Sequence, residues 1–159
     1  MYSVVRDINF PRDNEACRLL AVDEASRAKE CAAPSQLSSL SNRLRFITHQ
    51  AKRILLIDVS NCSAAEVEKI FRAVPELVTT HLRGSVLILT DFTGASFEQA
   101  AIRVMKETAV FNKSYVKKSA WVAGENLPQG FSENLMSFSR RDFPVFKTRE
   151  EALAWLAKD

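Results

Sequence analysis

The sequence has few of the residues that build familiar catalytic or metal-binding motifs. It contains only four glycines, which are not clustered, and two histidines in 159 residues. It has no P-loop, dinucleotide-binding glycine motif, nucleophile elbow or zinc-protease motif, so we do not expect an enzyme. The three cysteines are widely spaced and form no C-x-x-C pair. This spacing argues against a zinc cluster and predicts reduced thiols, no metal and no cofactor.

Long apolar runs and a strong charge of one sign are also absent. No apolar stretch approaches the roughly 18 residues that cross a membrane, so we expect no stable membrane insertion. Residues 1–15 contain acids and a proline where a signal peptide needs a basic and then an apolar region, which predicts a cytoplasmic protein. The net charge of +3 is too small to indicate nucleic-acid binding. The remaining composition, 47% hydrophobic and 26% charged, is that of an ordinary globular protein.

The character of the chain changes near residue 42. Residues 1–42 are interpreted as an N-terminal arm or linker, and a helix over part of this arm is an open alternative. Within it, the segment APSQLSSLSN at 33–42 is small and polar and contains a proline, as linkers do. Whether the arm docks or stays mobile is not decided by the pattern. We expect residues 43–159 to form one domain.

Strand and helix patterns alternate from residue 43 onward. Strands are predicted at 43–50, 53–60, 86–89, 119–125 and 144–148. Helices are predicted at 63–74, with a break or kink at Pro75 and one further turn, and at 97–111, 127–142 and 150–159. Capping boxes mark three helix starts: Ser63 with Glu66, Ser96 with Gln99, and Thr148 with Glu151. The order β-β-α-β-α-β-α-β-α predicts an α/β fold with a mixed, mostly parallel five-stranded sheet and helices on both faces.

Four stretches carry a resemblance to a known family. They read ILLIDVSNCS, LILTDFTGASF, YVKKSAWVAG and PVFKTREEALAWL. Over residues 43–159 the chain resembles the SpoIIAA-like branch of the STAS superfamily, whose fold is also similar to CRAL-TRIO lipid-binding domains. The resemblance implies a SpoIIAA-like fold and a regulatory or protein-binding role, and none of these stretches is itself catalytic.

The resemblance also bears on phosphorylation. Anti-sigma-factor antagonists of the superfamily carry a strand ending in D-L-S-G, followed by D-S-S-G, in which a serine accepts phosphate from a partner kinase. The first motif is matched here by DFTG at 91–94, which places the second on QAAI at 99–102. Ala100 and Ala101 therefore stand where the serines should be. Since alanine has no oxygen to phosphorylate, the usual phosphoacceptor is predicted to be missing.

Five polar or small residues are the candidates for a binding site. Asp58 and Asp91 end strands that the fold makes neighbours, and Thr93, Gly94 and Ser96 precede the following helix. The aspartates are expected to cap turns, with a shared proton or a metal as the alternative. Ser96 is interpreted as a helix N-cap, with an anion site at the helix start as the alternative. Phosphorylation of Thr93 or Ser96 would restore a phospho-switch.

A dense group of basic residues lies late in the chain. Lys113, Lys117, Lys118, Arg140 and Arg141 are interpreted as a solvated face, with an anionic partner surface as the alternative. The interleaved aromatic residues that would stack on bases are missing.

The predicted helix at 97–111 carries a wide apolar stripe. Its members are Phe97, Ala100, Ala101, Val104, Met105, Thr108 and Phe111. Most of the stripe is expected to pack in the core, and an edge that stays exposed would be a dimer or partner surface.

The combined interpretation is a non-catalytic interaction or regulatory module that binds a protein partner and could form a homodimer. The alternative is a protein that binds a small anionic, apolar or lipid-like ligand. An apolar pocket of at least about 300 Å³ beside the strand ends would favour that alternative, although the N-terminal arm is short for enclosing a lipid.

Overall fold

The computed structural model describes residues 34–125 and 127–159. The chain divides into two units, residues 1–38 and 39–159, and the account below concerns the second. Most of the predicted arm, including Cys17 and Cys31, lies outside the described residues. Cys62, the remaining cysteine, is free and buried.

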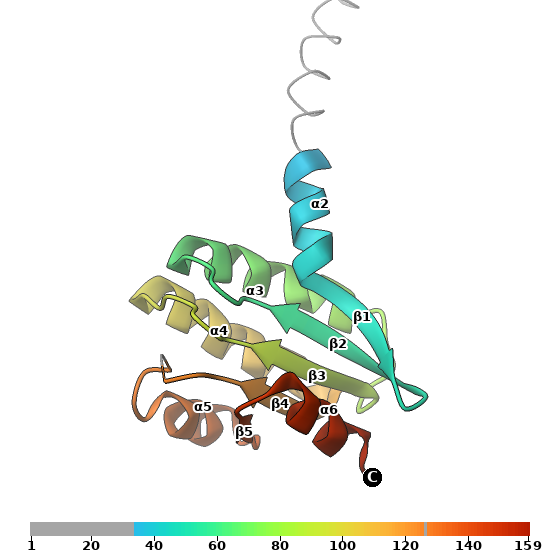
Figure 1. Ribbon diagram of the computed structural model, residues 1–159. Coiled ribbons are helices and arrows are strands. Elements are labelled where there is room, and N and C mark those ends of the chain that lie inside the picture. Colours follow the sequence, from blue (N-terminus) through green and yellow to red (C-terminus); the bar gives the residue numbers. More distant parts are fainter. Residues whose placement is uncertain (1–33, 126) are drawn as a thin grey trace, which may run out of the picture. The chain divides into compact units, whose positions relative to one another are not determined.

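A five-stranded sheet organises the domain, with its strands side by side in chain order (Figure 1). The strands are β1 (Leu44–His49), β2 (Lys52–Asp58), β3 (Val86–Asp91), β4 (Val116–Val122) and β5 (Val145–Phe146). The first strand pairs antiparallel with β2, and the remaining neighbours are parallel. The mixed, mostly parallel sheet predicted from the sequence is therefore confirmed.

Helices cover both faces of the sheet, as predicted. The described helices are α2 (Pro34–Arg43), which precedes the first strand in the chain, α3 (Ala64–Val78), α4 (Gln99–Phe111), the 3-10 turn η1 (Asn112–Ser114), α5 (Phe131–Ser139) and α6 (Arg149–Ala157). Helices α3, α4 and α5 pack on one face, and α6 packs on the other (Figure 1). The segment interpreted as a linker is helical in α2, so its small polar composition did not indicate its local structure. Within the described part of the chain, no helix is long and apolar enough to cross a membrane.

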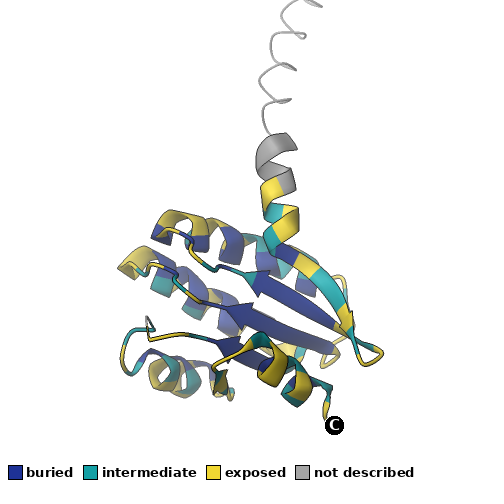
Figure 2. Ribbon diagram, viewed as in Figure 1, coloured by how far each residue is buried: buried dark blue, intermediate teal, exposed yellow. Residues whose placement is uncertain are grey.

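The sheet separates two hydrophobic cores. Leu55 and Ile57 of β2 face the core under α3 and α4, whereas Ile54 and Leu56 face the smaller core that Leu156 of α6 closes. Because successive strand residues point to opposite faces, a central strand covered on both sides must be apolar throughout. The middle of the sheet is accordingly buried (Figure 2).

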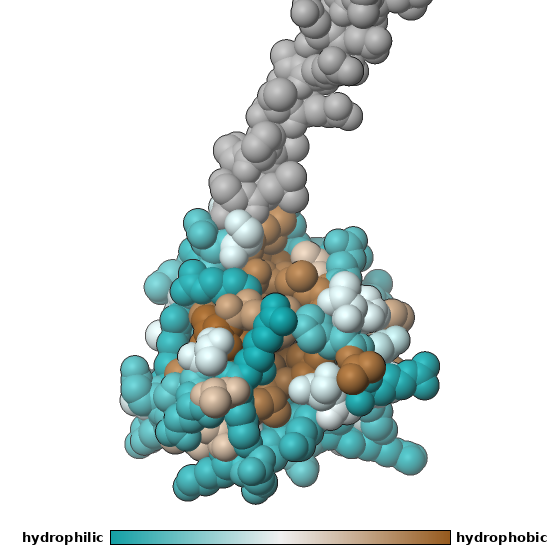
Figure 3. Space-filling model, turned by 90° about the vertical axis from the view of Figure 1, so that its right-hand side faces the viewer, coloured by the Kyte–Doolittle hydropathy of each residue, from teal (hydrophilic) through white to brown (hydrophobic). Residues whose placement is uncertain are grey.

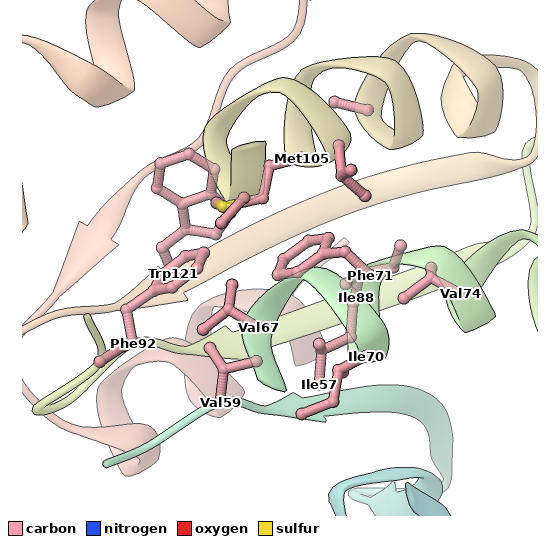
Figure 4. Close-up of a cluster of buried hydrophobic side chains, with 14 of the residues drawn as sticks. Ile57, Val59, Val67, Ile70, Phe71, Val74, Ile88, Phe92, Met105 and Trp121 are labelled. Carbon is pink, nitrogen blue, oxygen red and sulfur yellow. The ribbon is translucent and has the colours of Figure 1, made fainter. Parts of the chain in front are cut away.

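Aromatic side chains fill the larger core near the carboxyl ends of the strands. The Phe92 ring lies 6.2 Å from that of Phe71 and meets Trp121 edge-on, with ring centroids 5.1 Å apart. Figure 4 shows these rings together with Met105, which is also buried. Such offset and edge-on contacts add to the stabilisation that comes from burying the rings.

Helix α3 continues through Pro75, where a break or kink was predicted, so the predicted break does not occur. Proline has no backbone N–H, so the carbonyl of Phe71, four residues earlier, loses its helical donor. The buried hydroxyl of Thr108 in α4 donates a hydrogen bond to this carbonyl at 3.2 Å. The Thr108 side chain thus provides the donor that the Phe71 carbonyl loses to Pro75. This hydrogen bond allows the helix to continue past the proline.

Two of the three predicted capping boxes mark true helix starts. The hydroxyl of Ser63 accepts a bond from the backbone of Glu66, whose carboxylate accepts in return from the Ser63 backbone. The Thr148 hydroxyl accepts from the backbone of Glu151 at 3.2 Å. The third box, at Ser96, is not formed and is discussed with the site.

Candidate functional site

The two aspartates predicted to be neighbours lie side by side at the carboxyl edge of the parallel strands. Asp58 ends β2 and is paired in register with Asp91, which ends β3. Each carboxylate accepts a hydrogen bond from a backbone N–H two residues later: Ser60 N–H at 3.1 Å for Asp58, and Thr93 N–H at 2.9 Å for Asp91. The predicted turn-capping role of both aspartates is therefore confirmed.

A cation that the sequence interpretation missed bridges the two carboxylates. Arg149, the first residue of α6, donates from Nη2 to Asp58 Oδ2 at 2.9 Å and from Nε to Asp91 Oδ2. A second arginine, Arg43, lies 3.8 Å from Asp58 Oδ1 and donates to the Ser60 carbonyl at 2.8 Å. The Asp91 side chain is only 5% exposed, so its charge depends on this pairing.

The network neutralises the charge of both carboxylates. Burial raises the pKa of Asp58, but hydrogen bonds from Ser60 and Arg149 outweigh it and bring the pKa below its usual value. Two carboxylates and two guanidinium groups balance in charge at this edge of the sheet. No group of three or more His, Cys, Asp or Glu side chains that could hold a metal ion occurs among the described residues. The arrangement instead fastens α6 to the strand ends.

The loop after β3 is held tightly against the loop after β2. The Thr93 carbonyl accepts from the Asn61 N–H at 2.8 Å, and the Ser96 N–H donates to the Cys62 carbonyl at 2.9 Å. Gly94 has a φ of +68°, and a Cβ at this position would lie 2.3 Å from Asn61 Oδ1. The backbone conformation favours glycine, and a Cβ at this position would also have to displace the Asn61 side chain. Thr93 and Ser96 remain exposed on the pinned loop.

The prediction that Ser96 caps the following helix is wrong. Helix α4 begins at Gln99 after an N-cap at Glu98 that makes no side-chain cap bond. The reason is the packing of Phe97, whose ring lies 5.6 Å from that of Phe92 and 5.8 Å from that of Phe131. Together with the backbone bond from Ser96, this contact keeps the chain out of the helix for two more residues.

The exposed edge of α4 lies at its carboxyl end. Val110 and Phe111 are 45% and 57% exposed, so Phe111 leaves the inward stripe in which its spacing placed it. The Phe111 side chain borders a groove of about 330 Å³ between α3 and α4, where Arg72, Pro75 and Glu107 also lie. Helix α4 thus buries one face and presents apolar surface at one end.

The prediction of a solvated basic face holds fully for three of its five residues. Lys113, Lys117 and Arg140 are exposed, whereas Lys118 and Arg141 are partly buried. Arg141 donates to the Ala109 carbonyl at 3.3 Å and to the Ser119 hydroxyl. Burial lowers the pKa of Arg141 to about 10. Its spacing in the sequence resembles that of its exposed neighbours, so no local signal distinguished it.

The interior contains a cavity that is too small to hold a lipid-like ligand. It lies between the sheet and helices α4 and α5, it measures about 30 Å³, and Arg141 is part of its wall. The rim residues Asp58, Asp91, Thr93, Gly94 and Ser96 do not line it. A space that holds about two water molecules is far below the roughly 300 Å³ of a ligand pocket.

Comparison with solved structures identifies the fold. The domain is similar to the crystal structure of an uncharacterised protein of the DUF3478 family from Shewanella loihica PV-4, which has a SpoIIAA-like fold. The TM-score is 0.58 at 16% sequence identity, over 72% of this chain and 92% of that one. The chain has a SpoIIAA-like fold. Comparison with known protein families finds no match, and neither does comparison with curated proteins.

Within this SpoIIAA-like fold, the positions aligned with the second serine motif lie in the first turn of α4. Ala100 is exposed and Ala101 is 1% exposed. Neither side chain has a hydroxyl, so the first turn of α4 has no phosphoacceptor at these two positions, even though Ala100 is exposed. The nearest hydroxyls that precede it in the chain are those of Ser96 and Thr93.

Proposed function

We propose that this chain is a non-catalytic interaction module whose partner is another protein that docks along α4. The observation that carries the proposal is the exposed apolar edge of the helix, Val110 and Phe111, beside the groove between α3 and α4. Large apolar side chains exposed together are typical of protein-binding surfaces, and aromatic anchors beside a groove dominate many interfaces. The ion-paired carboxylates at the rim support the non-catalytic part of the proposal.

More apolar surface lies near this end of the helix. The amino ends of the parallel strands face the viewer in Figure 3, where apolar residues gather in the middle of a polar surround. Leu82, in the loop that leads into β3, is 82% exposed. This loop is joined to the chain after α4, because the Gly84 N–H donates to the Ser114 carbonyl at 2.9 Å. These residues extend the surface that a partner could cover.

One partner could contact both ends of α4. The 13 residues of the helix span about 20 Å at 1.5 Å per residue. A standard protein interface covers about 800 Å² on each side, a patch about 30 Å across. Such a patch is longer than α4, so we propose that a protein anchored at Phe111 extends along the helix to the exposed hydroxyls of Thr93 and Ser96. Phosphate added to either hydroxyl would then change the charge of the interface, which is the regulation that we propose.

The test compares two exposed apolar residues. Phe111→Gln removes the proposed anchor, and the control Val145→Gln alters a 44% exposed residue on β5. Each tagged variant is purified gently from its own organism, and the accompanying proteins are quantified by mass spectrometry. We expect one protein to accompany the wild type and the Val145 variant but to be at least tenfold depleted with Phe111→Gln. Equal recovery with all three proteins would refute the docking surface.

Phosphorylation is tested in the same material. Incubation with host lysate and ATP, followed by peptide mass spectrometry, should place a phosphate on Thr93 or Ser96. If this loop peptide stays fully unmodified under conditions that phosphorylate other host proteins, the proposed regulation is wrong. That result would not affect the proposed docking surface.

A further inference from the structure

A partly buried cation without a carboxylate partner, Arg141, lies in the wall of the internal cavity, with its guanidinium carbon 5.0 Å from the centre of the Phe143 ring. Arg141 donates to two uncharged acceptors, the Ala109 carbonyl and the Ser119 hydroxyl. No ion pair with Arg141 is formed within the described residues. A guanidinium group has five N–H donors, so these two bonds leave donors for a further acceptor. Taking a charge out of water without an opposite charge is unfavourable, and buried charges are normally paired.

A buried acceptor in the same cavity also has no partner. Asn112 is 2% exposed, and its Oδ1 atom makes no hydrogen bond with any described residue. Asn112 follows α4 directly, one helical turn after Ala109, whose carbonyl is bound by Arg141. An unmade hydrogen bond of this kind costs roughly 1–3 kcal/mol unless water or a ligand provides a donor. The cavity therefore offers an unneutralised cation and an acceptor that needs a donor.

The cavity has a route to the surface that would attract anions. Arg141 and Ser119 line both the inner cavity and an outer groove of about 380 Å³ along β4. Lys113, Lys117 and Lys118 line that groove, with Asp142 as the acidic residue among its lining side chains. Since β5 pairs only with the last two residues of β4, this edge of the sheet is left uncovered by a strand. Movement of the Arg141 side chain would join the two spaces.

We propose that Arg141 binds the carboxylate of a small organic acid that also carries a hydroxyl or amino group, whose hydrogen is donated to Asn112 Oδ1. The carboxylate matches the geometry of a guanidinium, which binds it through two parallel hydrogen bonds. The inner space of about 30 Å³ limits the buried part of the ligand to a few atoms. Trp121, Met105 and Phe143 supply the apolar part of the wall and set this limit. This site is independent of the proposed docking surface on α4.

The test titrates the full-length, ¹⁵N-labelled protein with sodium glycolate and, in parallel, with sodium acetate at equal ionic strength. Trp121 lines the inner cavity, whereas Trp155 lines the outer groove, so their indole N–H signals distinguish the two locations. We expect saturable shifts of the Trp121 indole and the Arg141 Nε–H signals. Acetate should bind about fivefold more weakly than glycolate, because it has no donor for Asn112.

Variants provide the matched control. Arg140 is the exposed neighbour of Arg141, so Arg140→Gln should leave the glycolate affinity unchanged, whereas Arg141→Gln should weaken it at least tenfold. If Arg141→Gln does not fold, Arg141→Lys keeps the charge without the planar fork and should bind more weakly than the wild type. The wild-type titration decides the matter without any variant. Shifts at Trp155 alone, or no saturable shift with either acid, would show that only water fills the cavity and would overturn the proposal.

Discussion

Replacing Thr108 should reveal how α3 tolerates Pro75. The Thr108→Val variant keeps the shape of the side chain but removes the hydroxyl that donates to the Phe71 carbonyl at 3.2 Å. Thr108 is 6% exposed, so water has little access to the carbonyl left behind. A buried polar group without a partner costs about 1–3 kcal/mol, and we expect a loss of about 1–2 kcal/mol in the free energy of unfolding.

The mechanism is tested by restoring the missing backbone donor. Pro75→Ala supplies an N–H that can bond to the Phe71 carbonyl within the helix, so Thr108→Val should cost close to nothing in that background. The coupling energy between the two substitutions should therefore be about 1–2 kcal/mol. Urea denaturation followed by tryptophan fluorescence measures all four proteins, with unchanged m-values as the check that each unfolds in one step. A cost for Thr108→Val that is the same within about 0.3 kcal/mol in both backgrounds would refute this account of the proline.

Two further predictions concern the rim. Arg149→Met leaves two adjacent carboxylates without their bridging cation and should destabilise the fold by about 2 kcal/mol at pH 7, below the 3–5 kcal/mol of fully buried pairs because Arg149 is partly exposed. The pKa of Asp58 is lowered in the folded state, so this stabilisation exists above the unfolded pKa and is lost as the pH falls through the folded pKa. The deficit of the variant should therefore shrink below pH of about 4, and a constant deficit down to pH of about 2.5 would contradict the ion-pair explanation. Gly94→Ala should cost more than Gly84→Ala, since both have a φ of +68° but only the new Cβ at 94 meets Asn61. Thermal unfolding of the two variants measures the difference, and equal losses would show that the contact with Asn61 is relieved freely.

The elements were predictable because their signals are local. The periodicity of the apolar residues and the capping box at Ser63 place α3, and the continuous apolar run of β2 correctly indicates burial on both faces. The adjacency of Asp58 and Asp91 followed from the topology, because the carboxyl ends of neighbouring parallel strands meet at one edge.

What the sequence did not indicate depends on contacts between distant residues. Arg149 lies 91 residues after Asp58 along the chain, and its place in the TREE segment resembled an ordinary exposed helix start. One signal could have indicated this role: Arg149 lies in the first turn of α6, directly after β5, and such a position is close to the carboxyl ends of the neighbouring strands. Helix α4 was predicted to start two residues too early. The ring of Phe97 packs against the core and keeps residues 97 and 98 out of the helix, and a capping pattern gives no information about such packing.

The central claim is that a different protein docks along α4 at Phe111. The most direct measurement places a photoreactive phenylalanine analogue at position 111 of the full-length protein in its own organism, with position 145 as the control. The proposal predicts a discrete, light-dependent adduct with one other protein at position 111 and none at position 145. A crosslink between two copies of this chain, the same adduct at both positions, or none at either would contradict the claim.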